Sequence, residues 1–232
     1  MSESRRVGYQ QQAVRPAAPR ATYWLLGAIG GAFLLEWLTL VSGDLTDFYV
    51  IWTIFSDDLW YDWIYRPWSP ITATFAHHPY GVTHILFNSI GLFFFGPMLE
   101  QIVGRLRFVS LFILTGALSS MAQASIDSFA NTDPTSPFLG GPALGASGAI
   151  MALIGVAVVI NPKAKIFMLF IPIPIPLWVA GIGFALLDVL GALSGSTGIG
   201  NFAHLSGMAI GLLYGLSVKR EMKARGIHFV TR

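Results

Sequence analysis

The chain of 232 residues contains no cysteine, and only 11% of its residues are charged. Without cysteine it forms no disulfide and no metal–thiolate site, and it has no cysteine nucleophile. So little charge, combined with 54% hydrophobic residues and a mean hydropathy of +0.63, excludes an ordinary soluble domain. The alternating pattern of a transmembrane barrel is also absent. The composition therefore predicts an all-α polytopic membrane protein, because helices satisfy their own backbone polar groups in hydrocarbon.

Six apolar segments predict transmembrane helices. They are Thr22–Val41, His84–Glu100, Arg107–Ala124, Ser147–Ile160, Ile175–Leu193 and Asn201–Val218. The domain plan is a flexible tail at residues 1–20, a six-helix domain at residues 21–218 and a basic tail at residues 219–232. The longest connection, Ser42–Thr83, is rich in tryptophan and tyrosine, which favours short helices in the membrane interface. These rings serve either as anchors or as substrate contacts. The proline-rich run Ile171–Pro176 argues against a regular helix there.

Lysine and arginine are distributed unequally across this topology. Of the fourteen, all but Arg66 fall on one side, and this bias places both termini in the cytoplasm. Because no transit-type leader precedes the first span, we expect a multi-pass protein of a prokaryotic plasma membrane. Basic residues at a membrane face indicate contact with anionic lipid rather than nucleic acid, since no stacking aromatics accompany them.

The fourth span is too short to cross a bilayer, which places a serine inside the membrane. Helices rise about 1.5 Å per residue, so Ser147 lies about 24 Å from Lys163 in a hydrocarbon core about 30 Å thick. By the same rise per residue, His204 lies about 22 Å from Lys219, and Asn88 lies about 25 Å from Arg105. His84 lies one turn beyond Asn88 on the same face. Polar groups at such depth are costly and indicate function, so the sequence predicts one functional layer built from three helices.

These side chains suit acyl transfer. A serine hydroxyl becomes a nucleophile when an adjacent base takes its proton, and His204 is the natural base for Ser147. The oxyanion that then forms needs hydrogen-bond donors, which His84, Asn88 and backbone amides can supply. Gly145 and Gly148 allow close backbone approach. A glycine stripe at Gly207, Gly211 and Gly215 is predicted to pack the sixth helix on the fourth and carry His204 toward Ser147.

In five motifs the chain resembles the rhomboid family of intramembrane serine proteases. The motifs are Phe75-Ala-His77, His84-Ile-Leu-Phe-Asn88, Glu100 before Gly104-Arg105, Gly145-Ala-Ser147-Gly148, and Ala203-His204. The resemblance implies a six-helix rhomboid fold with an interfacial first loop. It also implies a Ser147–His204 dyad without a third acid, no cofactor, and cleavage of single-span membrane proteins near the outer ends of their helices.

The sequence departs from the family pattern in two places. Met151 stands one turn after the serine, where an aromatic residue often packs on the catalytic histidine. The first loop reads Tyr65-Arg66-Pro67-Trp68 where the family commonly has a Trp-Arg pair.

Other interpretations of the same residues stay open. The chain could be a catalytically inactive rhomboid-like protein that binds membrane helices, or a small transporter or proton channel using His84, His204 and Asp188. A metal site at His77, His78 and His84 is disfavoured, because no carboxylate or cysteine follows at ligand spacing. The oligomeric state is not predicted.

Three further polar residues are expected to be structural. We expect His77 to hold the first loop and Asp188 to make a structural hydrogen bond. Glu100 is expected to cap a helix or to pair with Arg105 or Arg107.

Overall fold

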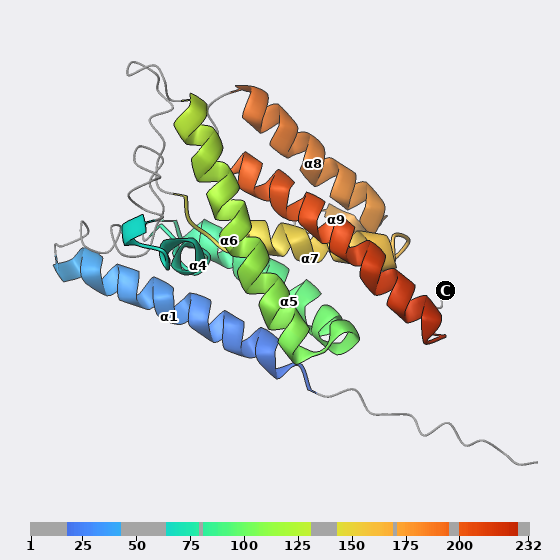
Figure 1. Cartoon of the computed structure of the whole chain (residues 1–232). Helices are drawn as coiled ribbons and strands as arrows, with labels where there is room; N and C mark the ends of the chain where they lie inside the picture. Colours follow the sequence, from blue (N-terminus) through green and yellow to red (C-terminus); the bar gives the residue numbers. More distant parts are fainter. Residues whose placement is uncertain are drawn as a thin grey trace, which may run out of the picture.

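The computed structural model describes residues 18–42, 64–78, 81–130, 143–168, 171–194 and 200–226. Its elements are α1 (Arg20–Ser42), α4 (Ser69–Ala73), α5 (Val82–Val103), α6 (Arg105–Ala130), α7 (Ser147–Ile160), β1 (Lys165–Met168), β2 (Ile171–Pro176), α8 (Leu177–Ser194) and α9 (Asn201–Ala224) (Figure 1). The predicted flexible tail falls almost entirely on residues 1–17, outside the described part of the chain. Trp52, Trp60 and Trp63 of the first loop also lie outside it. The described part of that loop contains the short helix α4, and the interfacial position expected for the loop stays a prediction.

The six expected helices correspond to α1 and α5 to α9, and the protein is a mostly helical, multi-pass membrane protein. Four described helices are long and apolar enough to cross a membrane, namely α1, α5, α6 and α8, whereas α7 has only 14 residues. The bounds of α7 match the predicted segment, but α6 and α9 run six residues past theirs. Hydropathy marks the apolar part of a helix, while the backbone hydrogen bonds continue into polar turns. The number of spans stays a prediction.

The proline-rich run corrects the expectation of an all-α chain. Residues of β2 pair antiparallel with β1, with Lys165 opposite Pro176 and Ile166 opposite Ile175. Prolines at every second position leave the N–H groups missing along one edge of the strand, so extended pairing along the other edge remains available. This two-stranded hairpin connects α7 to α8.

Helix α7 is the centre of the bundle. Eleven of its 14 residues are buried, among them Leu153 and Val156, which are completely inaccessible. A helix that is apolar on all sides is stable only when other helices surround it. Helices α5, α6, α8 and α9 all contact α7, and α9 packs most extensively against it.

The predicted glycine stripe makes the contact between α9 and α7, which confirms the predicted packing of these two helices. A Cβ on Gly207 would collide with the carbonyl oxygen of Gly148, and one on Gly211 would collide with the backbone of Ala152. From the other helix, a Cβ on Gly155 would lie 2.7 Å from the Met208 carbonyl oxygen. The two backbones therefore touch directly, as small residues permit in membrane helices.

Glu100 fastens α5 to the beginning of α1. Its carboxylate accepts hydrogen bonds from the backbone N–H groups of Ala21 (2.9 Å) and Thr22 (2.8 Å), and from the Thr22 hydroxyl (2.9 Å). The first N–H groups of a helix lack partners within the helix, and an acidic group there is favourable. Arg105 lies 3.8 Å from the same carboxylate. The expected capping role of Glu100 is confirmed.

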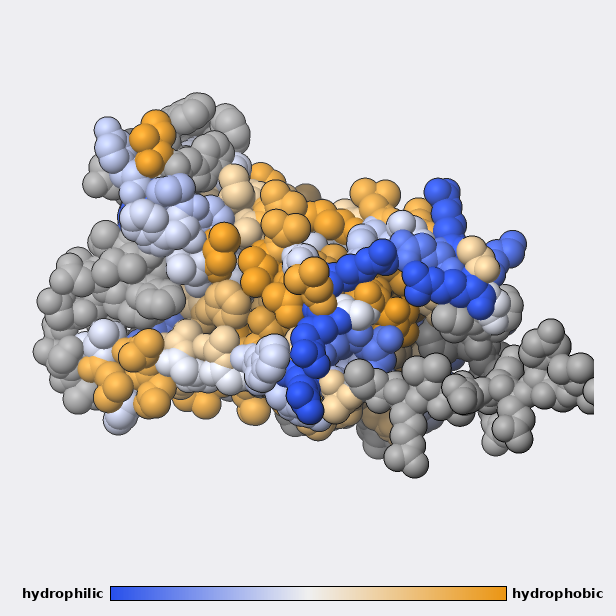
Figure 2. Space-filling view, turned by 60° about the horizontal axis from the view of Figure 1, so that its bottom comes forward, coloured by the Kyte–Doolittle hydropathy of each residue, from blue (hydrophilic) through white to orange (hydrophobic). Residues whose placement is uncertain are grey.

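Basic residues gather at one end of the bundle. Arg107 at the start of α6 pairs with Glu221 on α9 at 2.8 Å, and Lys219 donates to the carbonyl of Val159 at the end of α7 at 2.8 Å. In the view of Figure 2, strongly hydrophilic residues lie toward the right of the molecule, and its middle is largely hydrophobic. The start of α1 and the end of α9 lie at this same end (Figure 1). The helix starts that carry the candidate site residues lie at the opposite end.

Replacing Gly211 with alanine should force α7 and α9 apart. The new methyl would meet backbone atoms of Ala152, which cannot rotate away, and overpacking of this kind costs about 1–3 kcal/mol. Thermal unfolding in detergent should therefore shift to lower temperature.

Gly183→Ala on α8 is the matched control, because nothing lies within 4 Å of a Cβ there. It should leave the unfolding temperature unchanged or raise it. Equal behaviour of the two variants would contradict the proposed backbone contact.

Candidate active site

Ser147 is the first residue of α7 and is half-buried. The turn before it depends on Gly145, whose φ of +112° is a conformation that other residues rarely adopt. The Gly145 N–H donates to the carbonyl of Ala73 at 2.8 Å, which ties this turn to the end of α4. The first N–H groups of a helix have no partner within it, so the start of α7 offers backbone donors beside Ser147.

His84 and Asn88 reach the same turn from α5. A Cβ on Gly145 would lie 2.7 Å from Cε1 and 2.9 Å from Nε2 of His84, and 3.8 Å from Nδ2 of Asn88. The absence of a side chain at Gly145 thus makes room for the imidazole. Both predicted oxyanion donors lie next to the backbone that leads into Ser147.

His77 orients Asn88. Its Nδ1 lies 2.9 Å from the carbonyl oxygen of Phe75, so Nδ1 carries the hydrogen and Nε2 accepts. Nε2 lies 2.8 Å from Nδ2 of Asn88, which must therefore donate one amide hydrogen to it. The second amide hydrogen of Asn88 remains for another acceptor. The backbone N–H of His77 in turn donates to Glu36 on α1 at 2.6 Å, which ties the loop before α5 to α1.

Burial keeps His77 neutral. Burial first, and the nearby His84 second, lower the pKa of His77 from 6.5 to about 4, against the opposing effect of the hydrogen bond to Phe75. The ring of His84 lies 5.1 Å from that of His77, centroid to centroid. A protonated His77 would lose its acceptor for Asn88, so the orientation of Asn88 depends on the neutral form.

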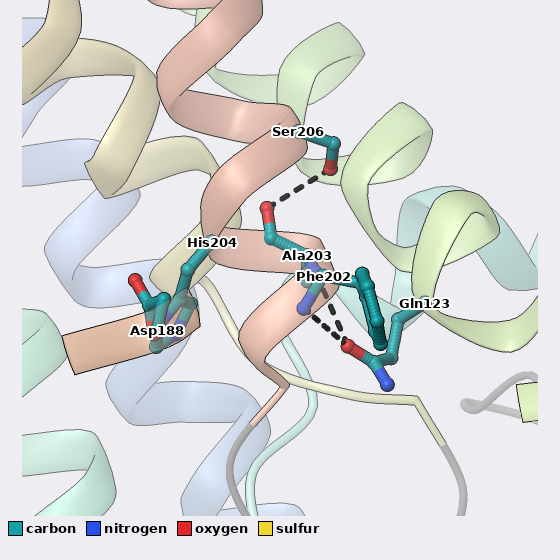
Figure 3. A network of polar contacts seen from close by, with 6 residues as sticks. All are labelled: Gln123, Asp188, Phe202, Ala203, His204 and Ser206. Carbon is teal, nitrogen blue, oxygen red and sulfur yellow. Dashed lines mark hydrogen bonds and ion pairs between the residues drawn. The ribbon is translucent and has the colours of Figure 1, made fainter. Parts of the chain in front are cut away.

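His204 lies in the first turn of α9, whose start α6 holds in place. Gln123 on α6 accepts hydrogen bonds from the backbone N–H groups of Phe202 (3.0 Å) and Ala203 (3.2 Å), as Figure 3 shows. A Cβ on Gly148 would lie 3.3 Å from the carbonyl oxygen of Ala203. The residues next to Ser147 and His204 are therefore in contact. Between these two described side chains themselves no hydrogen bond is formed, which is common for catalytic pairs without substrate.

Asp188 on α8 contacts His204, whereas the sequence led us to expect only a structural hydrogen bond. Its Oδ1 lies 2.8 Å from Nδ1 of His204 (Figure 3), and its side chain is 9% exposed. The expected hydrogen bond is thus present, but its partner is the candidate base. The sequence carried one signal for this position: Gly191 lies three residues after Asp188 and therefore on the same face of the helix. In the structure this face meets α9, because a Cβ on Gly191 would lie 2.6 Å from Oδ1 of Asn201.

The remaining predicted residues have packing positions. Gly148 and Gly207 lie in the contact between α7 and α9, and a Cβ on Gly148 would also lie 2.8 Å from the Ser119 hydroxyl. Met151 is buried in the hydrophobic core. The described structure thus brings together Ser147, His204, His84, Asn88 and Gly145, with His77 one contact behind Asn88.

The chain is similar in sequence to known proteins. The family model for the rhomboid domain matches residues 65–221. The chain is 34% identical over 149 residues to RHOMBOID-like protein 12, mitochondrial, of Arabidopsis thaliana (60% of this chain, 43% of that protein). It is 28% identical over 165 residues to Rhomboid protein 1, mitochondrial, of Saccharomyces cerevisiae (70% and 45%), and 28% identical over 150 residues to Rhomboid protease GlpG of Haemophilus influenzae (64% and 68%). The chain thus spans under half the length of the first two.

Two of these relatives are mitochondrial proteins by name, which contradicts the prediction of a prokaryotic plasma membrane. The physical reason lies in what the charges report. Hydropathy and the lysine and arginine bias describe how helices cross a bilayer, and that cost is much the same in any membrane. The lysine and arginine bias shows which side of the protein is basic, but it does not show which compartment lies on that side.

The low pKa of His77 predicts a stability that falls with acidity. Unfolding releases the ring to its ordinary pKa of 6.5, so the unfolded chain binds the proton first as the pH drops toward 4. The free energy of unfolding should be highest above pH 6.5 and should decline by about 3 kcal/mol as the pH falls from 6.5 to about 4. Thermal unfolding in detergent across this range measures the decline.

His77→Gln should flatten this dependence, although the variant starts less stable. The exposed neighbour provides the control, because His78→Gln should keep the full decline. A decline that persists unchanged in His77→Gln would refute the assignment.

Proposed function

Because the chain belongs to the rhomboid family, we propose that it is an intramembrane serine endopeptidase that cuts transmembrane segments of other membrane proteins, with Ser147 as nucleophile and His204 as base. One observation supports this most: the candidate nucleophile stands at the start of a buried helix, and the start of α9, which carries the histidine, is in direct backbone contact with the first turn of that helix. Inactive family members would need neither group.

The proposed reaction is acyl transfer. The Ser147 oxygen attacks the scissile carbonyl as Nε2 of His204 takes its proton, so a C–O bond forms and the carbonyl becomes an oxyanion. When the C–N bond breaks, His204 gives that proton to the leaving amine. A water molecule, deprotonated by His204 in the same way, then releases the acyl group and restores Ser147.

The oxyanion site is assembled from α5 and the start of α7. We assign it the second amide hydrogen of Asn88, His84 and the Ser147 backbone N–H. The positive end of the α7 dipole favours negative charge at this place. Since the donors are held by other contacts beforehand, such as His77 for Asn88, they need little reorganisation when charge develops.

The substrate we propose is a single-span membrane protein whose helix unwinds near its end. A peptide bond within a helix has its carbonyl engaged in a backbone hydrogen bond and turned away from attack. The resemblance to the rhomboid family further suggests small residues at the cut. Hydrophobic residues that cover the outside of α5 and α8 face lipid, from which such a helix would arrive.

Ser147→Ala and His204→Asn should each abolish activity. We expect no labelling of either variant by a fluorophosphonate probe, which reacts with an activated serine and requires no knowledge of the substrate. Neither variant should cut a tagged single-span protein with a glycine-containing outer helix end in proteoliposomes.

Ser206→Ala is the matched control, because this hydroxyl on α9 donates only to the Ala203 carbonyl at 3.1 Å. It should label and cut like wild type. Cutting by Ser147→Ala at the wild-type rate would disprove the protease assignment, and a wild type that neither labels nor cuts would favour the inactive alternative.

Asn88→Ala should lower kcat by about 100- to 1,000-fold with KM little changed, as expected for a donor that acts mainly on the oxyanion. Asn161→Ala, at the opposite end of α7, should leave kcat unchanged. A rise in KM alone would instead assign Asn88 to substrate binding.

A further inference from the structure

We propose that Asp188 is a positioning residue for His204, which completes a Ser147–His204–Asp188 triad where the family resemblance implies a dyad. The inference rests on the proposed function of Ser147 and His204. Its basis is the 2.8 Å contact between Oδ1 of Asp188 and Nδ1 of His204, two side chains that point toward one another from α8 and α9 (Figure 3).

The contact selects one tautomer of the imidazole. An ionised carboxylate can only accept hydrogen bonds, so the hydrogen of a neutral His204 resides on Nδ1. Nε2 then keeps its lone pair, which is what a base for the serine proton requires. When His204 takes that proton it becomes an imidazolium, and the adjacent carboxylate stabilises the new charge in a site of low dielectric.

The fold holds Asp188 in this position. The buried residues of α8 recur at helical spacing and define the face that it turns inward: Leu177, Ala180, Gly181, Asp188 and Gly191. Gly191 allows α8 to lie directly on Asn201, the first residue of α9. Helices α6 and α8 thus both hold the start of α9, and it is α8 that contacts the imidazole.

Asp188 also accounts for the departure at position 151. An aromatic residue there would restrict the imidazole by packing, whereas the flexible thioether of Met151 is a weak acceptor and restricts it little. Met151 is 6% exposed and belongs to the hydrophobic core. In this chain the hydrogen bond with Asp188 supplies the orientation.

Asp188→Asn is the first test. The amide is nearly the same size but can donate to Nδ1, which favours the wrong tautomer, so kcat should fall by about 100- to 10,000-fold. KM should stay within about threefold of wild type, since Asp188 acts only after binding. Asp188→Glu retains the carboxylate and should recover part of the lost kcat.

Asp127→Asn is the matched control. Asp127 on α6 accepts from Gln123 at 2.8 and 3.0 Å, and Gln123 in turn holds the start of α9. This variant removes the same charge from the same end of the bundle without touching His204. Because the amide oxygen of the substituted side chain can still accept from Gln123, this variant should keep kcat, and both Asp→Asn variants should unfold at the wild-type temperature.

Nitrogen-15 NMR of histidine-labelled protein gives the readout that a merely structural role would not change. The His204 ring signals, identified by their absence in His204→Asn, should report a single Nδ1–H tautomer in wild type and its loss in Asp188→Asn. An unchanged tautomer overturns the inference, and so does a loss of kcat that Asp127→Asn reproduces. If wild type proves inactive toward both probe and substrate, the proposed function fails while the tautomer still decides the role of Asp188.

Discussion

Direct backbone contact between α7 and α9 is the constraint on which the rest of the site depends. Helix α7 is too short and too apolar to be stable without helices around it, and it carries the candidate nucleophile in its first turn. Gly207 and Gly211 let α9 touch its backbone, which sets the distance between Ser147 and His204. In hydrocarbon, where apolar burial gives little preference for one helix pairing over another, close packing of small residues is what selects this pair.

Around that contact, buried polar groups bind each other in chains that begin far from Ser147. Glu36 on α1 holds the backbone of His77, and the His77 ring holds Asn88. On the other side Gln123 holds the start of α9 and Asp188 holds His204. Polar groups in a low-dielectric interior are costly unless paired, so each link favours one arrangement of its neighbours. The proposed chemistry depends on orientation that α1, α6, α8 and the loop carrying His77 supply together.

Much of this arrangement could be predicted from the sequence because it depends on local patterns. The bounds of α7, the glycine stripe and the capping role of Glu100 all follow from apolar length, four-residue spacing and the needs of a helix start. The partner of Asp188 could not be predicted. Its depth in the membrane was compatible with the site, but the direction of its side chain depends on how α8 is rotated against α9. The hairpin at Ile171–Pro176 was missed for a related reason: proline excludes a helix there, but pairing with Lys165–Met168 requires a partner strand.

The sequence by itself determined the membrane class, the residues of the candidate site and the surface through which α9 meets α7, since hydropathy, depth and glycine spacing are one-dimensional properties. Only the tertiary structure decided which nitrogen of His204 meets a carboxylate, which hydrogen of Asn88 is already taken, and which bare glycine admits the His84 ring. Those outcomes depend on side-chain directions across helices far apart in the chain. The spacing of residues within one helix therefore does not determine these contacts.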